Sequence, residues 1–299
     1  MSEQVLSVSS ADIGFDVAEP LIEGVELSLE EGEIVGLTGR SGIGKTTLVR
    51  TCAGIIRPLS GSIIFAGESL ANKARGEVGL IPQRLGLIQH QTVGYNVLMG
   101  ALPRAKWYQS LFSLPSAEMR ETTRKAVEAV GLQDKILTSV NSLSGGQQRR
   151  VAIARAMVQN PKLILADECL GELDAETAKD IIGLLRGLAV SGTSILIVDH
   201  NPVRARTFCD RVMQLRGRKL VELGDDEQDT KPALPVLRRP NNERYTQSCS
   251  DSPQATDDSS GIGHTDSFLA DYFAPANNPV QTGRCVLKPE GDNSGGMAA

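Results

Sequence analysis

The feature that most constrains this chain is a stretch near its start that fits the phosphate-binding pattern G-x-x-x-x-G-K-[ST], namely Gly39-Arg40-Ser41-Gly42-Ile43-Gly44-Lys45-Thr46. A short apolar run at residues 34–37 predicts a buried strand before it, and residues 45–54 predict a helix after it. Glycines let backbone N–H groups close around phosphate oxygens, and a helix N-terminus adds a favourable dipole. Lys45 can then reach the outer phosphates while Thr46 holds Mg²⁺. The stretch, with Thr47 after it, predicts an α/β domain that binds a nucleotide.

A second segment, Leu143-Ser144-Gly145-Gly146-Gln147, reads as the N-terminus of a helix. Ser144 is a favourable N-cap, and Gln147 three residues later completes a capping box. Gly145 and Gly146 leave bare backbone N–H groups that an anion can approach. Without further context, a well-capped helix that does nothing else is the alternative interpretation.

With this second segment the chain resembles the ATP-binding-cassette (ABC) ATPases, over about residues 5 to 224. L-S-G-G-Q is the family's signature, and the other family motifs follow in the family's order. They are the Q-loop glutamine Gln83, the Walker B strand with Asp167 and Glu168 at its end, the D-loop with Asp174, the switch histidine His200, and Phe15 where the family places an aromatic under the adenine. The Phe15 spacing is loose, and an ordinary core phenylalanine is the alternative. The resemblance implies a P-loop NTPase cassette with a RecA-like core, antiparallel β elements and a helical subdomain.

Phosphoryl-transfer chemistry gives each of these residues an expected role, because positioning and charge neutralisation dominate it. Asp167 follows a Leu- and Ile-rich run typical of a parallel strand buried on both faces, and can hold Mg²⁺ through water. Glu168 comes one residue later and can orient or deprotonate the attacking water. We expect His200 to reach the γ-phosphate and Glu168, and Gln83 to contribute to the Mg²⁺ site and to catalysis.

The resemblance also implies a partner arrangement. In the family, the signature of one cassette closes on the nucleotide that the other cassette holds, so we expect a homodimer with two ATP molecules at its interface. ATP binding would close this dimer and hydrolysis would reopen it, which drives separate membrane permease subunits.

Two departures from the family pattern stand next to the catalytic glutamate. Cys169 replaces the usual proline, and the D-loop reads Leu170-Gly171-Glu172 instead of beginning with serine or alanine-serine. The missing proline frees φ at residue 169 and Gly171 adds backbone freedom, so both changes bear on the stiffness of the D-loop. The residues that carry the chemistry are all present, and we expect an active ATPase.

Composition narrows the setting. The chain has 299 residues and a net charge of −5, which argues against strong non-specific binding to nucleic acid. It has no run of 18 apolar residues and no signal-peptide pattern, so we expect no transmembrane helix. The resemblance to ABC ATPases then implies a peripheral protein on the cytoplasmic face of the inner membrane. Five cysteines, without any C-x-x-C pairing, are expected to be reduced thiols.

The expected domains are an ABC ATPase domain over residues 1–224, with a helical subdomain over about 86–144, and a tail over 225–299. The tail holds 6 Lys+Arg against 12 Asp+Glu and is rich in Asn, Ser, Pro and Gly, which predicts acidic disorder. In the subdomain, Trp107, Tyr108 and Phe112 can be its own core or a docking surface, and we favour the core.

Within the family, the insert is most similar to that of bacterial phosphonate-import ATPases. The residues that carry this resemblance are Asn96-Val97-Leu98, Gly100, Leu102, Trp107, Ser110-Leu111-Phe112 and Val130-Gly131-Leu132. It implies an importer of phosphonate-type anions that works with a permease and an extracytoplasmic substrate-binding protein. The alternatives are the ATPase of another transporter, such as a lipoprotein-releasing or peptide exporter, and a non-transport ABC accessory protein.

Overall fold

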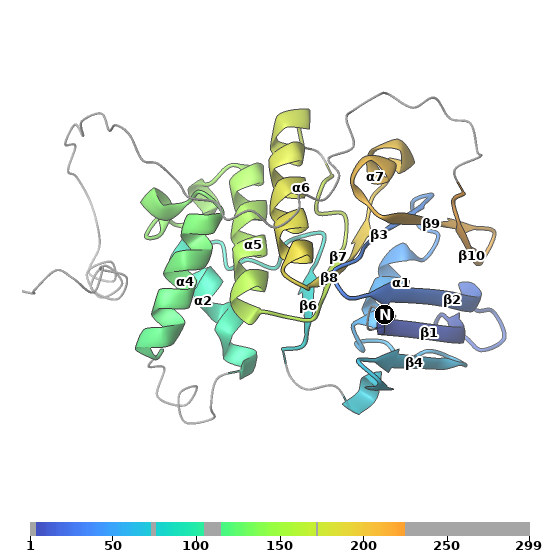
Figure 1. Cartoon of the computed structure of the whole chain (residues 1–299). Coiled ribbons are helices and arrows are strands. Elements are labelled where there is room, and N and C mark those ends of the chain that lie inside the picture. The colour runs from blue at the N-terminus through green and yellow to red at the C-terminus, as the bar shows by residue number, and fades with distance from the viewer. Residues whose placement is uncertain (1–3, 73–75, 105–114, 172, 225–299) are drawn as a thin grey trace, which may run out of the picture.

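The computed structural model of the chain describes residues 4–72, 76–104, 115–171 and 173–224. The aromatic cluster of Trp107, Tyr108 and Phe112 and the tail 225–299 lie outside these residues. Figure 1 shows α2 (Val93–Leu98), α4 (Ala117–Ala129) and α5 (Gly145–Gln159) at one end of the described part. The antiparallel strands β1 (Gln4–Ile13), β2 (Ile22–Glu30) and β4 (Ser62–Phe65) lie at the other end.

The central sheet has the strand order β10-β9-β3-β8-β7-β6, and all its neighbours run parallel except β9 and β10. The carboxyl ends of the parallel strands therefore meet at one edge, where ligand sites of open α/β sheets form. The strands are β3 (Ile34–Gly39), β6 (Val78–Ile81), β7 (Leu163–Ala166), β8 (Ser194–Val198), β9 (Arg211–Arg216) and β10 (Lys219–Glu222).

A second sheet has the order β2-β1-β4-β5 and is antiparallel throughout. Its strands are β1 (Gln4–Ile13), β2 (Ile22–Glu30), β4 (Ser62–Phe65) and β5 (Glu68–Ser69). In β2, buried and more exposed positions largely alternate, as expected of a strand with one face on a core.

Two hydrophobic cores lie on the two faces of the central sheet, and β7 contributes to both. Leu163 and Leu165 join the core that includes the antiparallel sheet and α1 (Lys45–Cys52), whereas Ile164 and Ala166 join the core that includes the helices. This alternation is the period of two that a strand requires, and it explains why β7 is apolar at every position.

The helical side comprises α2 (Val93–Leu98), a 3₁₀ turn η2 (Met99–Arg104), α4 (Ala117–Ala129), α5 (Gly145–Gln159) and α6 (Ala175–Val190); α7 (Pro202–Phe208) packs against β3 and β9. The sequence predicted the strand at 34–37 and the helix beginning at Lys45, and both are confirmed. The capping box at Ser144 is confirmed as well, because its hydroxyl accepts from the N–H of Gln147 while the Gln147 side chain accepts from the N–H of Ser144.

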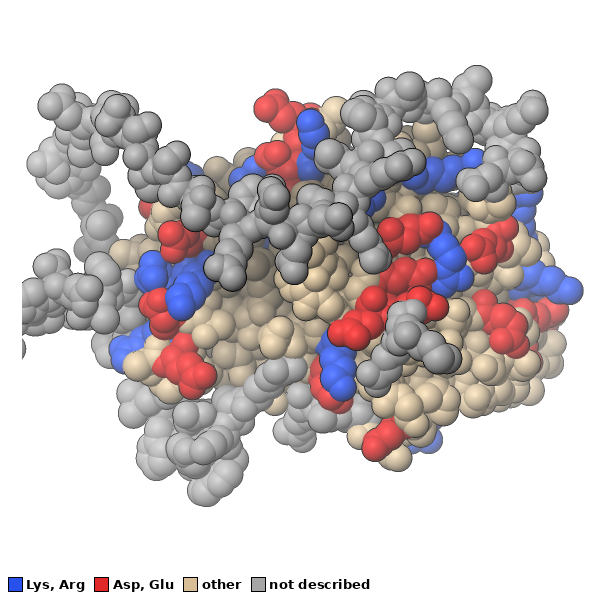
Figure 2. Space-filling view, in the orientation of Figure 1, with Lys and Arg blue, Asp and Glu red and all other residues tan. Residues whose placement is uncertain are grey.

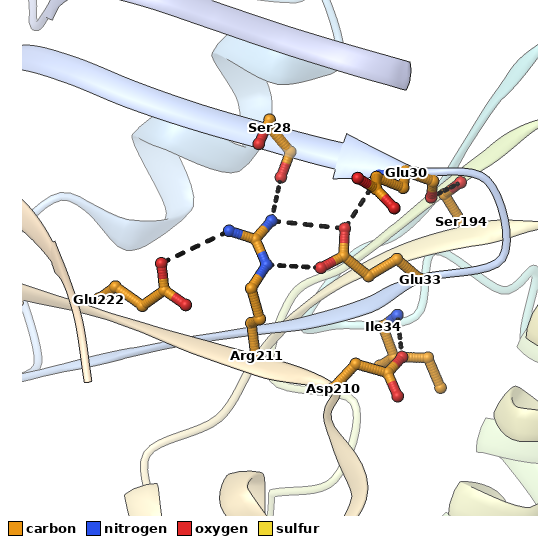
Figure 3. Close-up of polar contacts among 8 residues, drawn as sticks. All are labelled: Ser28, Glu30, Glu33, Ile34, Ser194, Asp210, Arg211 and Glu222. Atoms are coloured by element: carbon orange, nitrogen blue, oxygen red, sulfur yellow. Dashed lines mark hydrogen bonds and ion pairs between the residues drawn. The ribbon is translucent and has the colours of Figure 1, made fainter. Parts of the chain in front are cut away.

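Arg211 at the start of β9 ties the two sheets together (Figure 3). Its Nε lies 2.6 Å from Glu33 Oε1, and its Nη2 donates to the carbonyl oxygen of Ser28 in β2 at 2.6 Å. Nη1 also lies 3.6 Å from Glu222 Oε2. A planar guanidinium can serve several acceptors in fixed directions, so this side chain helps to fix how β2 lies beside the central sheet.

The described surface carries both signs of charge. On the face drawn in Figure 2, acidic and basic side chains are interspersed, with Lys or Arg next to Asp or Glu in most places. Among the described helices, none combines the length and apolar character needed to cross a bilayer.

Candidate functional site

The predicted phosphate-binding loop connects the end of β3 to the start of α1. Gly39, Gly42 and Gly44 have φ values of 144°, 78° and 114°, which residues with a Cβ rarely adopt. Gly44 is the N-cap residue of α1 and leaves the first N–H groups of the helix without a side-chain cap. These N–H groups can serve an anion, as expected of a phosphate-binding helix start.

Lys45 is buried, and its Nζ folds back over the loop. It donates hydrogen bonds to the carbonyl oxygens of Gly39 at 2.9 Å and of Arg40 at 3.0 Å. Burial lowers the pKa of Lys45, while the nearby carboxylates of Glu168 and Asp167 raise it in part. The ammonium group is thus held at the mouth of the loop with two acids facing it.

Asp167 follows β7 directly and is 4% exposed. Burial raises its pKa, and a hydrogen bond from Thr46 lowers it in part. Its Oδ1 is buried without any hydrogen-bond partner among the described residues. An unpaired buried carboxylate oxygen costs free energy that a hard cation would recover, so Asp167 and Thr46 fit a Mg²⁺ ion.

Thr46 and Asp167 line a cavity of about 200 Å³ together with Gln83. The remaining lining residues are Val49, Arg50, Leu80, Pro82 and Arg84. The fold therefore brings together all three residues that the sequence assigned to the Mg²⁺ site. They come from three separate segments, after β6, after β7 and at the start of α1.

Glu168 is the centre of a second cluster. Gln83 Nε2 donates to Glu168 Oε2 at 2.7 Å, and His200 Nε2 lies 2.8 Å from the same oxygen. Glu168 also has φ 54°, the left-handed conformation that glutamate seldom adopts. Such backbone strain persists only where the surroundings enforce it, and it concentrates at functional sites.

The phosphate-binding loop and His200 face one hollow. A more open depression of about 650 Å³ is lined by Gly39, Arg40, Ile43 and His200, with Pro202 and residues 214–217 completing it. His200 thus borders the loop on one side and contacts Glu168 on the other.

The turn after Glu168 is held by hydrogen bonds despite the missing proline. The N–H of Gly171 donates to the carbonyl oxygen of Glu168 at 3.1 Å, and the Gly171 carbonyl accepts from the Arg149 guanidinium in α5. Cys169 is 1% exposed, and burial raises the pKa of its thiol to about 12. The sequence alone did not determine how rigid this turn is. In the structure, hydrogen bonds within the turn and to Arg149 hold it in place.

The signature residues lie at the start of α5. None of Ser144, Gly145, Gly146 and Gln147 lines the two hollows described above. Gly146 packs on α6, where an added Cβ would lie 2.7 Å from Thr177 Cγ2. Asp174 caps α6 by accepting from the N–H of Thr177 at 2.9 Å.

Phe15 is 76% exposed, so it is not a core residue. It lies in the segment between β1 and β2. Leu21 at the end of this segment and Ile22 at the start of β2 have side chains that lie against Gly44. An exposed aromatic ring offers a planar apolar surface.

Sequence reasoning missed two supporting arginines. Arg155 in α5 donates to the carbonyl oxygens of Leu85 and Gly86, both at 2.7 Å, and so holds the segment that follows Gln83. Arg204 in α7 binds the carboxylate of Asp199, the residue before His200. Both arginines are plain in the sequence, but their partners are visible only once the chain is folded.

Comparison with known proteins agrees with this geometry. Residues 22–171, from β2 to the turn after Glu168, match the family described as ABC transporter. The chain belongs to the ABC transporter family. Membership implies ATP binding and hydrolysis, and it confirms the family resemblance drawn from the motifs.

Two relatives show the degree of sequence identity to other family members. The Phosphonates import ATP-binding protein PhnC of Rhizobium johnstonii is 35% identical over 71% of this chain and 79% of its own length. The Methionine import ATP-binding protein MetN 2 of Rhodococcus jostii is 38% identical over 68% of this chain, which spans 60% of that relative's length.

Solved ABC cassettes have the same fold. A dimeric cassette in a post-hydrolysis state, bound to ADP and Pi, matches with a TM-score of 0.64 and 26% identity, over 73% of this chain and 97% of its own. A nucleotide-free cassette matches with a TM-score of 0.63 and 24% identity, over 73% and 90% of the two chains.

Proposed function

We propose that this chain is the ATP-hydrolysing subunit of an ABC importer and that Glu168 is its catalytic base. One observation carries the proposal: a single carboxylate oxygen of Glu168 contacts both Gln83, at 2.7 Å, and His200, at 2.8 Å. Two segments far apart in sequence thus converge on one acid beside a phosphate-binding loop. This arrangement suits a carboxylate that orients and deprotonates an attacking water.

The neighbouring residues take the supporting roles. The N–H groups of residues 39–47 and the ammonium of Lys45 bind the phosphates, and Phe15 offers its ring to the adenine. Asp167, Thr46 and Gln83 hold Mg²⁺, which neutralises phosphate charge when bound. The unpaired Oδ1 of Asp167 supports this role because it needs a cationic or donor partner.

The signature residues act on the nucleotide of a second copy. Ser144, Gly145, Gly146 and Gln147 stand at a helix start away from the hollows beside the phosphate-binding loop of their own chain. A head-to-tail homodimer would give each ATP both sets of groups, with Asp174 of the D-loop near the interface. The dimeric form of a similar cassette supports this arrangement.

The transported substrate we propose is a phosphonate-type anion. The support is the resemblance of the insert and the name of relatives such as the PhnC protein of Rhizobium johnstonii. Methionine is the second candidate, because MetN proteins are similar to this chain to the same degree. In both cases the chain works at the cytoplasmic face of the inner membrane with permease subunits and an extracytoplasmic binding protein.

Glu168→Gln tests the catalytic proposal. The variant keeps the groups that bind ATP but loses the base, so we expect no measurable hydrolysis and an ATP-bound dimer by size-exclusion chromatography with light scattering. Glu128→Gln, on the exposed face of α4, is the matched control and should hydrolyse ATP like the wild type. A Glu168→Gln protein that binds ATP and stays monomeric would contradict the head-to-tail dimer.

Purification of the tagged chain from membranes in mild detergent tests the substrate. A permease recovered with a binding protein that binds phosphonates supports the first candidate, and one that binds methionine supports the second. Recovery with an exporter-type permease, or with soluble proteins alone, would contradict the importer.

A further inference from the structure

We propose that the ion pair between Asp199 and Arg204 is the device that positions His200 against Glu168. The inference rests on the proposed function, in which His200 acts beside the catalytic base. It assigns Asp199 and Arg204 a positioning role, since neither is expected to touch the nucleotide.

Both oxygens of the Asp199 carboxylate accept hydrogen bonds. Arg204 Nε lies 2.7 Å from Oδ2 and Arg204 Nη2 lies 2.8 Å from Oδ1, while the N–H of Asn201 donates to Oδ1 at 2.9 Å. The Asp199 side chain has no exposed surface, and that of Arg204 is 27% exposed. A bidentate pair of this kind fixes both the distance and the plane of its partners.

The ion pair lies near the turn that follows Glu168, because both Asp199 and Arg204 interact electrostatically with Cys169. Asp199 and His200 are consecutive residues after β8, and their side chains reach different partners. The carboxylate of Asp199 turns to α7, and the imidazole of His200 reaches Glu168 at 2.8 Å. The His200 side chain is 44% exposed and therefore gains little orientation from packing; its backbone must supply it.

The segment from Asp199 to Arg204 is closed at both ends. The N–H of Asp199 donates to the carbonyl oxygen of Leu37 in β3 at 3.1 Å. At the other end, Asn201 caps α7 by accepting from the N–H of Arg204 at 3.1 Å, and the Arg204 guanidinium returns to Asp199. His200 thus stands in a short loop that is held to β3 at one end and closed at the other by the ion pair between Arg204 and Asp199.

A buried ion pair is seldom retained for stability alone, because desolvation of the two charges offsets most of their attraction. Its value lies in specifying one arrangement. His200 stands between Asp199 and Asn201, the N-cap residue of α7, and its imidazole contacts Glu168. The geometry therefore points to placement of the imidazole as the role of the pair.

Arg204→Ala and Arg204→Lys test this in the full-length protein. Misplacement of a catalytic group by about 1 Å can cost about 100-fold in rate, so we expect kcat to fall by about 10- to 100-fold in Arg204→Ala and by less in Arg204→Lys. The KM for ATP should stay within about twofold, because the binding groups remain. In a His200→Ala background, Arg204→Ala should have no further effect on kcat, because residues that act as a unit are not additive.

Arg211→Ala is the matched control. Arg211 also pairs with a partly buried carboxylate, Glu33, but ties the two sheets far along β9 from His200. We expect Arg211→Ala to lower the unfolding midpoint, leave kcat unchanged and combine additively with His200→Ala. Equal losses of kcat in the Arg204 and Arg211 variants, or an undiminished effect of Arg204→Ala without His200, would overturn the proposal.

A readout without hydrolysis separates this inference from the proposed function. The chain has three histidines, so NMR spectra of histidine-labelled protein are simple, and His200→Ala assigns the His200 ring. Arg204→Ala should shift the His200 ring resonances, whereas Arg211→Ala should not. An unshifted His200 ring overturns the positioning role, while a wild type that binds but never hydrolyses ATP defeats the proposed function alone.

Discussion

Gln83 and Glu168 lie opposite each other because of strand register. The parallel strands β6 and β7 pair Ile81 with Ala166, and each chain then continues for two residues beyond its last pair. The Gln83 amide and the Glu168 carboxylate consequently meet at 2.7 Å, although 85 positions separate them in sequence. The hydrogen bond between these two groups follows from the edge of the sheet, not from either loop alone.

Gln83→Leu should therefore lower the rate of hydrolysis. A hydrogen bond to a charged group is worth about 1.5–3 kcal/mol, which corresponds to about a 10- to 100-fold loss of kcat if the bond is maintained during the reaction. Steady-state ATPase assays over a range of Mg²⁺ concentrations measure both kcat and the Mg²⁺ requirement. Gln89→Leu, at an exposed position near the same loop, is the control. Similar kcat values for wild type and Gln83→Leu would refute this role.

Asp167→Asn should stabilise the protein in the absence of nucleotide and Mg²⁺. Burial raises the pKa of Asp167 above its usual 3.8 and outweighs the help from Thr46, Arg50 and Lys45, so the ionised form costs free energy in the folded state. We expect the free energy of unfolding at neutral pH to rise by about 1 kcal/mol, measured by urea titration. The same variant should lose the increase in thermal stability that Mg²⁺-ATP gives the wild type.

The advantage of Asp167→Asn should depend on pH with a definite sign. Because the folded pKa of Asp167 is raised, the cost of its charge is complete above that pKa. As the pH falls from there toward 3.8, the folded wild type takes up a proton before the unfolded chain does, and the advantage shrinks. A difference that grows on acidification would show that the carboxylate stabilises the fold.

Gly146→Ala should destabilise the contact between α5 and α6. The new Cβ would lie 2.7 Å from Thr177 Cγ2, and overpacking of this kind costs about 1–3 kcal/mol. Thr177→Ser removes that methyl group and should restore most of the lost stability in urea titration. Gly183→Ala in α6 has open space around it and should be neutral or stabilising. If the double variant is no more stable than Gly146→Ala, steric crowding is not the cause.

Cys52 and Cys169 should resist alkylation in the native protein. Both are buried, and burial raises each thiol's pKa to about 12, so at pH 8 only about one molecule in ten thousand carries the reactive thiolate. Iodoacetamide treatment followed by mass spectrometry should label neither residue until urea is added. Rapid native labelling of Cys169 would reveal opening of the turn after Glu168.

The sequence alone predicted the features whose signals lie within a few consecutive residues. The phosphate-binding loop, the strand before it and the capping box at Ser144 are local patterns, and the structure has each where the sequence put it. Asp167 at a strand end is of the same kind. Their physical causes, backbone sterics and helix capping, act between near neighbours, so no knowledge of the folded chain is needed.

Other features depend on residues that only the fold brings together. Glu168 adopts a left-handed conformation that glutamate disfavours, and the residues next to it in the sequence do not predict this conformation. The partners of Arg155 lie 69 and 70 positions away, and its role follows from their placement. Phe15 could be a core or a surface residue on sequence grounds, and only the fold shows it to be exposed.

Through its hydrogen bonds to Leu85 and Gly86, Arg155 connects α5 to the segment that follows Gln83. Gly100 in η2 packs closely on α5 at the same residue, because a Cβ at position 100 would lie 2.1 Å from the carbonyl oxygen of Arg155. Ser144 stands eleven positions away along the same helix, about 16 Å at 1.5 Å per residue. The helix that begins at Ser144 is therefore joined, through Arg155, to the segment that follows Gln83.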